Sequence, residues 1–175
     1  YTSLSLHLFS DGVDSAPQQL RSLIAQVQKY LGSDGVISSI IGRHYAMNRN
    51  EEWEKTENAY RLFASPEAPS LDWEENIARS YAKNINDEFI GALPLPGRKH
   101  IQNGDAIIFF NFREDSMQQI VTPFIDFSFP HFPPVHFENV YIATMTDYIH
   151  SPTIHVAFPP EKNDNSLGKV LADHD

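Results

Sequence analysis

Residues 36–50 read VISSIIGRHYAMNRN, a short apolar run that leads directly into a segment with two arginines, Arg43 and Arg49. The run at 36–41 is rich in isoleucine and valine, which predicts a buried strand. Helical patterns precede and follow it, and strands that alternate with helices are typical of layered α/β domains. This stretch therefore indicates the fold class and supplies the first candidate binding residues.

The elements around this strand follow from apolar spacing. After Pro17 the apolar residues recur with the 3.6-residue period of a helix, and Gly32 ends that pattern. The same spacing predicts further helices at 50–63, 70–81 and 117–124, and residues 167–175 are either a final helix or an exit segment. Strands are predicted at 3–9, 106–110, 140–145 and 153–158. The run at 106–110 (AIIFF) is continuously apolar, which predicts a strand covered on both faces.

This order predicts an α/β fold, a layered domain with a mainly parallel sheet and helices on both faces. We expect residues 1–175 to form a single domain. The chain begins with Tyr1 rather than Met, so we also expect it to be an excised piece of a longer chain.

Composition narrows the possible functions. The formal net charge of −10 argues against a nucleic-acid-binding surface, which would need a basic face. The absence of cysteine removes disulfides, thiolate nucleophiles and zinc–thiolate sites, and it fits a cytoplasmic setting. Because no apolar run approaches eighteen residues, we expect no membrane span.

Charged residues follow three of the predicted strands directly. Asp11 and Asp14 lie in the first loop, Arg43 and Arg49 in the second, and Arg113 in the third. Ligands of open α/β sheets bind beyond the carboxyl ends of the strands, and arginine grips carboxylate or phosphate with paired hydrogen bonds. These loops therefore predict a small anion site. The alternative is that Arg43 and Arg49 form surface ion pairs with nearby glutamates, namely Glu51, Glu52 or Glu54.

Five motifs carry a resemblance to a known family. They are IIGRHYAMNRNEEWEKTENAY (40–60), NDEF (86–89), NGDAIIFFNFR (103–113), YIATMTDY (141–148), and VAFPP followed by LGKVL (156–171). In their order and spacing they resemble the inserted, substrate-binding domain of cofactor-independent phosphoglycerate mutase, and they span nearly the whole chain. The GxSxG, P-loop and GxGxxG motifs are absent from the sequence.

The resemblance implies a two-domain enzyme that interconverts 3-phosphoglycerate and 2-phosphoglycerate in glycolysis. A phosphatase-like domain, related to alkaline phosphatase and not represented in this chain, would carry a serine nucleophile and two manganese ions. This chain would hold the substrate, with no catalytic or metal-binding residue of its own and without activity alone. By the same resemblance the substrate ligands are Arg43, Arg49, Arg113 and Asp14.

The chain departs from the family pattern at four positions. Val13 and Ser116 stand where the family motifs have arginines, while Asn48 and Asn50 stand where they have aspartates. Possible substitutes for the missing cations are His44, Arg98 and Lys99. Three hypotheses follow: a substrate domain of a divergent mutase, a non-catalytic binding relative that lost part of the site, or a phosphotransfer domain with another substrate.

Overall fold

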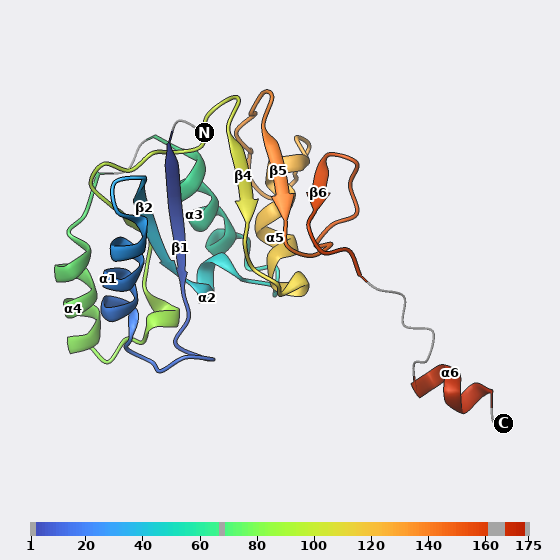
Figure 1. Ribbon diagram of the computed structural model, residues 1–175, viewed down its shortest axis with the longest axis horizontal. Coiled ribbons are helices and arrows are strands. Elements are labelled where there is room, and N and C mark those ends of the chain that lie inside the picture. Colours follow the sequence, from blue (N-terminus) through green and yellow to red (C-terminus); the bar gives the residue numbers. More distant parts are fainter. Residues whose placement is uncertain (1–2, 67–68, 161–166, 174–175) are drawn as a thin grey trace.

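The computed structural model describes residues 3–66, 69–160 and 167–173 (Figure 1). Within these residues the strands are β1 (Leu4–Ser10), β2 (Gly35–Gly42), β3 (Leu93–Pro94), β4 (Ala106–Phe109), β5 (Tyr141–Thr144) and β6 (Ile154–Val156). The helices are α1 (Leu20–Leu31), α2 (Arg43–Ala46), α3 (Trp53–Ala64), α4 (Trp73–Ala82), the 3₁₀ turn η1 (Asp87–Phe89), α5 (Glu114–Ile125) and α6 (Leu167–Ala172).

The strands form two three-stranded sheets, ordered β1-β2-β3 and β4-β5-β6. All pairs are parallel except β2 with β3, where Ser39 lies opposite Pro94. The expected α/β class and mainly parallel pairing are confirmed. We expected a single sheet, but the described strands form two. β1 and β4 do not pair with each other, and each lies at the edge of its own sheet.

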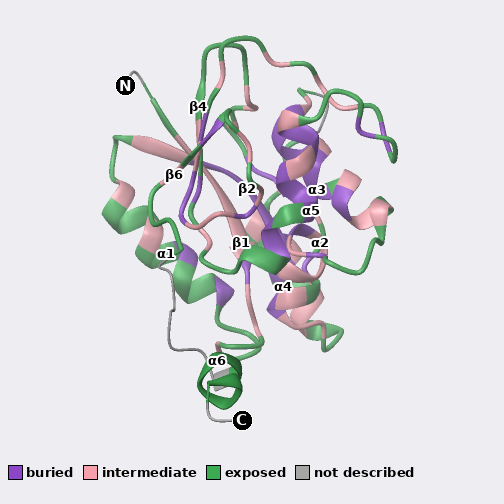
Figure 2. Ribbon diagram, turned by 90° about the vertical axis from the view of Figure 1, so that its right-hand side faces the viewer, coloured by how far each residue is buried: buried purple, intermediate pink, exposed green. Residues whose placement is uncertain are grey.

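The first sheet is covered on both faces. Leu20 and Ile24 of α1 and Ile77 of α4 pack with Ile37 and Ile40 of β2 in one apolar cluster. The larger cluster on the other side includes Phe63 of α3 and continues into the second sheet through buried side chains of β4, β5 and β6. Figure 2 shows this burial along α3 and α5. One core therefore joins the two sheets and fixes the loops that follow β2 and β4 relative to each other.

The second sheet is covered on one face only within the described residues. Phe109 is buried against α5, whereas Ile108 is 62% and Phe110 is 75% exposed. The expectation that the AIIFF run is covered on both faces is therefore wrong. Side chains of a strand alternate between its faces, and none of the described helices lies over Ile108 and Phe110.

Helix boundaries differ from the sequence expectations by a few residues. The arginine segment begins with the one-turn helix α2 rather than a loop, and α3 begins at Trp53, after Glu52, rather than at Asn50. Asp72 caps α4 by accepting a hydrogen bond from the Glu75 N–H. Of the two alternatives for the end of the chain, the final helix is present as α6, while residues 174–175 lie outside the described residues. No helix in the described part of the chain is long and apolar enough to cross a membrane.

Candidate functional site

The loops that follow β1 and β4 and the helix that follows β2 meet at an open cavity of about 290 Å³. It is lined by Phe9, Asp11, Asp14, Arg43, Met47, Asn111, Phe112 and Arg113. The carboxyl ends of β1, β2 and β4 thus lie at one edge, where ligands of α/β sheets bind. Three of the four predicted ligands, Asp14, Arg43 and Arg113, line the cavity; the fourth, Arg49, does not.

Arg43 is the most buried of these charged side chains, with 15% of its surface exposed. Its Nη1 donates to Asp11 Oδ1 and, at 2.8 Å, to Asp14 Oδ2. Burial opposes the charge of Arg43, but these hydrogen bonds raise its pKa above the ordinary value. Burial likewise opposes ionisation of Asp11, yet the Arg43 guanidinium and local hydrogen bonds lower the pKa of that carboxyl to about 2. Both groups are therefore charged at neutral pH.

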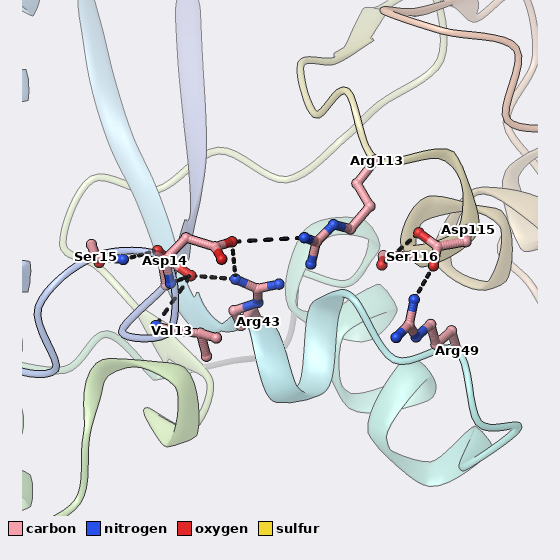
Figure 3. Close-up of polar contacts among 9 residues, drawn as sticks. Val13, Asp14, Ser15, Arg43, Arg49, Arg113, Asp115 and Ser116 are labelled. Carbon is pink, nitrogen blue, oxygen red and sulfur yellow. Dashed lines mark hydrogen bonds and ion pairs between the residues drawn. The ribbon is translucent and has the colours of Figure 1, made fainter.

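In the view of Figure 3, Arg113 and Arg49 lie to the right of Asp14 and Arg43, near Asp115 and Ser116. Nη2 of Arg113 lies 3.9 Å from Asp14 Oδ2, so that carboxylate bridges Arg43 and Arg113. Arg49 forms an ion pair with Asp115, in the first turn of α5. Within the described residues, the ion pairs of Arg43 and Arg49 are with aspartates of the other loops rather than with the glutamates at 51, 52 and 54.

The two positions that depart from family arginines differ in their surroundings. Val13 is 56% exposed, in the loop of Asp11 and Asp14. Ser116 is only 3% exposed, and its hydroxyl lies 3.1 Å from Asp115 Oδ1. Burial opposes ionisation of Asp115, but the bonds from Ser116 and Arg49 lower the pKa of its carboxyl. Ser116 therefore supports the aspartate that holds Arg49.

Two of the site loops rest on the short turn η1. A Cβ on Gly42, which directly precedes Arg43, would lie 2.1 Å from the carbonyl oxygen of Glu88. Gly12 has a positive φ of 74°, and a Cβ there would lie 3.0 Å from the Glu88 nitrogen. Both positions require glycine because backbone approaches backbone. In the sequence, NDEF at 86–89 stands out only as part of the family resemblance. Its spacing does not indicate that it supports the loops of the site.

Asp87 is the buried anchor of that turn. Its Oδ2 accepts hydrogen bonds from the backbone N–H groups of Gln19 and Leu20, where α1 begins, at 2.8 and 2.9 Å. The Tyr81 hydroxyl donates to Oδ1 at 2.5 Å, and the Ser10 hydroxyl donates to the Asp87 carbonyl. Asp87 therefore ties both ends of the segment 10–20, which carries Asp11 and Asp14.

The suggested substitute cations do not line the cavity. The His44 ring packs against Tyr45 and Phe89, at centroid distances of 5.1 and 4.8 Å. Arg98 donates to the carbonyl of Ser65, and the backbone of Lys99 donates to Ser38 Oγ. The His44 ring and the Arg98 guanidinium therefore have partners outside the cavity.

The acidic residues of the site do not form a metal centre. Among the described residues there is no group of three or more His, Cys, Asp or Glu side chains that could hold a metal ion. Asp11 and Asp14 instead face guanidinium groups. The described residues therefore do not fit the two manganese ions that the resemblance implies for the longer protein.

The fold and the site define an α/β domain that gathers arginine and aspartate side chains at the carboxyl ends of its strands. The family described as "BPG-independent PGAM N-terminus (iPGM_N)" matches residues 1–150 of this chain. The chain belongs to this family of 2,3-bisphosphoglycerate-independent phosphoglycerate mutases.

Individual proteins similar to this chain are phosphoglycerate mutases, in agreement with the family match. The chain is 37% identical over 175 residues to the 2,3-bisphosphoglycerate-independent phosphoglycerate mutase of Francisella tularensis subsp. novicida. This alignment covers 96% of this chain and 34% of that protein. It is 38% identical to the corresponding enzyme of Legionella pneumophila, over 99% of this chain and 35% of that protein. A crystal structure of Leishmania mexicana phosphoglycerate mutase matches with a TM-score of 0.75 and 25% identity, over 92% of this chain and 33% of that one. This chain thus spans about a third of its relatives' length.

Proposed function

We propose that this chain is the substrate-binding part of a divergent cofactor-independent phosphoglycerate mutase. Arg43 and Arg113 hold the anionic groups of phosphoglycerate, Arg49 supplies a third cation, and Asp14 accepts a hydrogen bond from a substrate hydroxyl. Two guanidinium groups can grip carboxylate or phosphate through paired hydrogen bonds. Holding the glycerate while the phosphoryl group moves converts an encounter between two molecules into a step within one complex.

The observation that carries this proposal is the shared position of Asp14 between two arginines. Its carboxylate lies 2.8 Å from Arg43 and 3.9 Å from Arg113, at the rim of the cavity. Two guanidinium groups that lie close enough to share one carboxylate can also bind one small anionic ligand beside it.

The remaining parts of the activity belong to the longer protein in this proposal. A phosphatase-like domain of the same parent chain would supply the serine nucleophile, which would accept the phosphoryl group, and two manganese ions, which would act as Lewis acids. The resulting isomerase acts in glycolysis, in the cytoplasm. This chain then binds phosphoglycerate and contacts that domain, and it neither binds nucleic acid nor enters a membrane.

Calorimetric titration of the chain with 3-phosphoglycerate tests the proposal. We expect binding by the wild type and a loss of at least about tenfold in Arg43→Ala, because a buried charged hydrogen-bond donor is removed. Arg79→Ala is the matched control, since Arg79 is an exposed helical arginine that pairs with Glu75 on α4. Equal binding by Arg43→Ala and Arg79→Ala would contradict the proposed site.

One observation favours a second candidate, a non-catalytic binding relative. Each arginine of the site already faces an aspartate, and Val13 and Ser116 add no cation. Absence of 3-phosphoglycerate binding by a chain that folds, together with an incomplete serine and metal-ligand set in the parent protein, would support this second function. Mutase activity of the parent protein would exclude it. A phosphotransfer domain for a substrate with fewer anionic groups would bind that substrate but not 3-phosphoglycerate.

A further inference from the structure

A buried amide on α5 holds the turn that carries Arg49. Gln119 is 8% exposed and lies one helical turn after Asp115 on the same helix. Its Oε1 accepts a hydrogen bond from the backbone N–H of Glu51 at 3.1 Å. Its Nε2 donates to Asn48 Oδ1 at 3.2 Å and to Thr56 Oγ1 at 2.5 Å.

Asn48 completes this network on the other side of Arg49. It is 7% exposed, and its Oδ1 accepts hydrogen bonds from the backbone N–H groups of Asn50 and Glu52 at 3.1 and 3.3 Å. Its amide nitrogen donates to Glu52 Oε2 at 2.7 Å. The asparagine that replaces a family aspartate therefore organises the backbone of the turn, while the Arg49 side chain is held by Asp115.

The turn needs such support because its backbone is strained. Glu51 has a φ of +59°, in the left-handed region that a residue with a side chain adopts only at an energetic cost. The backbone N–H of Glu51 donates its hydrogen bond to Oε1 of Gln119. Without that acceptor, the strained conformation would lose a partly buried hydrogen bond.

The helix that carries Gln119 also begins at Arg113, another arginine of the site. Arg113 is the N-cap of α5, Asp115 lies in its first turn, and Gln119 follows one turn later. The turn at 48–52 belongs to the segment that leaves the first sheet, whereas α5 follows β4 of the second sheet. The contacts of Gln119 therefore fix the spacing between two arginines that come from different sheets.

We infer that Gln119 is a positioning residue for Arg49 in the anion site. It sets the backbone of the arginine turn relative to Arg113, without itself contacting the anion. This inference rests on the proposed function, since it concerns how phosphoglycerate is gripped. Its structural part, the control of the Arg49 turn, is measurable without a ligand.

A double-mutant cycle tests the inference with 3-phosphoglycerate as the probe. Gln119→Met keeps the size and shape of the side chain and removes all of its hydrogen bonds. Gln118→Met is the matched control, because Gln118 is its exposed neighbour on α5. We expect Arg49→Ala to weaken binding about tenfold in the wild type and the control, but less than about threefold in Gln119→Met.

The cycle distinguishes positioning from general destabilisation. Arg43→Ala should weaken binding by the same factor with and without Gln119→Met, because Arg43 is held by Asp11 and Asp14 instead. An unchanged factor for Arg49→Ala in Gln119→Met would overturn the inference. If Gln119→Met does not fold, Thr56→Val removes one partner of the same amide and is expected to act in the same direction.

Amide hydrogen exchange in the ligand-free chain separates this inference from the proposed function. We expect the N–H groups of Asn50, Glu51 and Glu52 to exchange faster in Gln119→Met than in Gln118→Met, with unchanged exchange in α1. Unchanged exchange at these amides would overturn the inference whether or not the chain binds 3-phosphoglycerate. Absence of binding by the wild type, with faster exchange in the variant, would instead contradict the proposed function alone.

Discussion

The Asp14 carboxylate lies 2.8 Å from Nη1 of Arg43 and so occupies one side of the guanidinium that a bound anion would use. Asp14→Asn keeps the shape of the side chain and removes its charge. We expect the affinity for inorganic phosphate to rise about fivefold, as for the loss of one like charge about 4 Å away in water. Titration with phosphate measures this, and Asp34→Asn, an exposed site after α1, is the control. Weaker phosphate binding by Asp14→Asn would show that the carboxylate does not compete with the anion.

The close packing of Gly42 on η1 makes a second prediction. Gly42→Ala places a methyl group 2.1 Å from the Glu88 carbonyl oxygen, so one of the two backbones must move. We expect a loss of at least about 2 kcal/mol in the free energy of unfolding, because overpacking against backbone is costly. Gly91→Ala is the control, since nothing lies within 4 Å of the added carbon there. Equal urea midpoints of the two variants would contradict the close contact.

Asp87 supports the start of α1 from a distant part of the chain. Asp87→Asn places an amide group against the N–H groups of Gln19 and Leu20 or against the Tyr81 hydroxyl. We expect the free energy of unfolding to fall by about 2 kcal/mol, as for a lost helix cap with a buried unpaired donor. Chemical denaturation checks this against Glu88→Gln, a change at the neighbouring acid. An equally small effect of both variants would refute the anchoring role.

His7 makes the stability depend on pH. Burial, with the nearby Arg98, lowers the pKa of His7 from its ordinary 6.5 to about 4. Between pH 6.5 and pH 4 the unfolded chain therefore binds a proton that the folded chain does not, so stability falls as the pH falls through this window. We expect a contribution of about 2–3 kcal/mol to be lost by pH 4.

Unfolding free energies of His7→Gln between pH 7 and pH 4 test this contribution. The variant should have a flatter pH dependence than the wild type. His150→Gln changes a fully exposed histidine and should leave the slope as it is. Parallel curves for the wild type and His7→Gln would refute the prediction.

The order of the longer helices and strands could be predicted from the sequence, whereas α2, η1 and β3 were not predicted. Apolar spacing identified β1, β2 and β4 and the helices between them, because burial of one face dictates that spacing. The carboxyl ends of parallel strands meet at one edge. The rule places the loops of Asp14, Arg43 and Arg113 together, and these three residues line one cavity, whereas Arg49 does not.

The partners within the site could not be predicted in the same way. Arg43 and Asp11 are 32 residues apart and Arg49 and Asp115 are 66 apart, so their pairing depends on how the loops fold in space. The division into two sheets likewise depends on which distant strands share hydrogen bonds. Neither property leaves a periodic signal in the sequence.

The AIIFF run illustrates a different limit. Continuous apolarity does not reveal which side chains are covered, and Phe109 is 7% exposed while Phe110 is 75% exposed. We expect Phe109→Ala to lower the free energy of unfolding by about 3–5 kcal/mol. Phe110→Ala should change it by no more than about 0.5 kcal/mol. Thermal denaturation of the two variants checks the difference, and similar losses would indicate that both faces are covered.

The unequal exposure of Val13 and Ser116 makes the two departures from the family pattern unequally reversible. An arginine at position 13 could extend into solvent beside Asp14, so that departure can be undone by a single substitution. An arginine at position 116 would need to leave a site that is 3% exposed and would displace the serine that supports Asp115. Introducing the two arginines that the resemblance implies therefore has a preferred order, with position 13 first and position 116 only after the surroundings of α5 have changed.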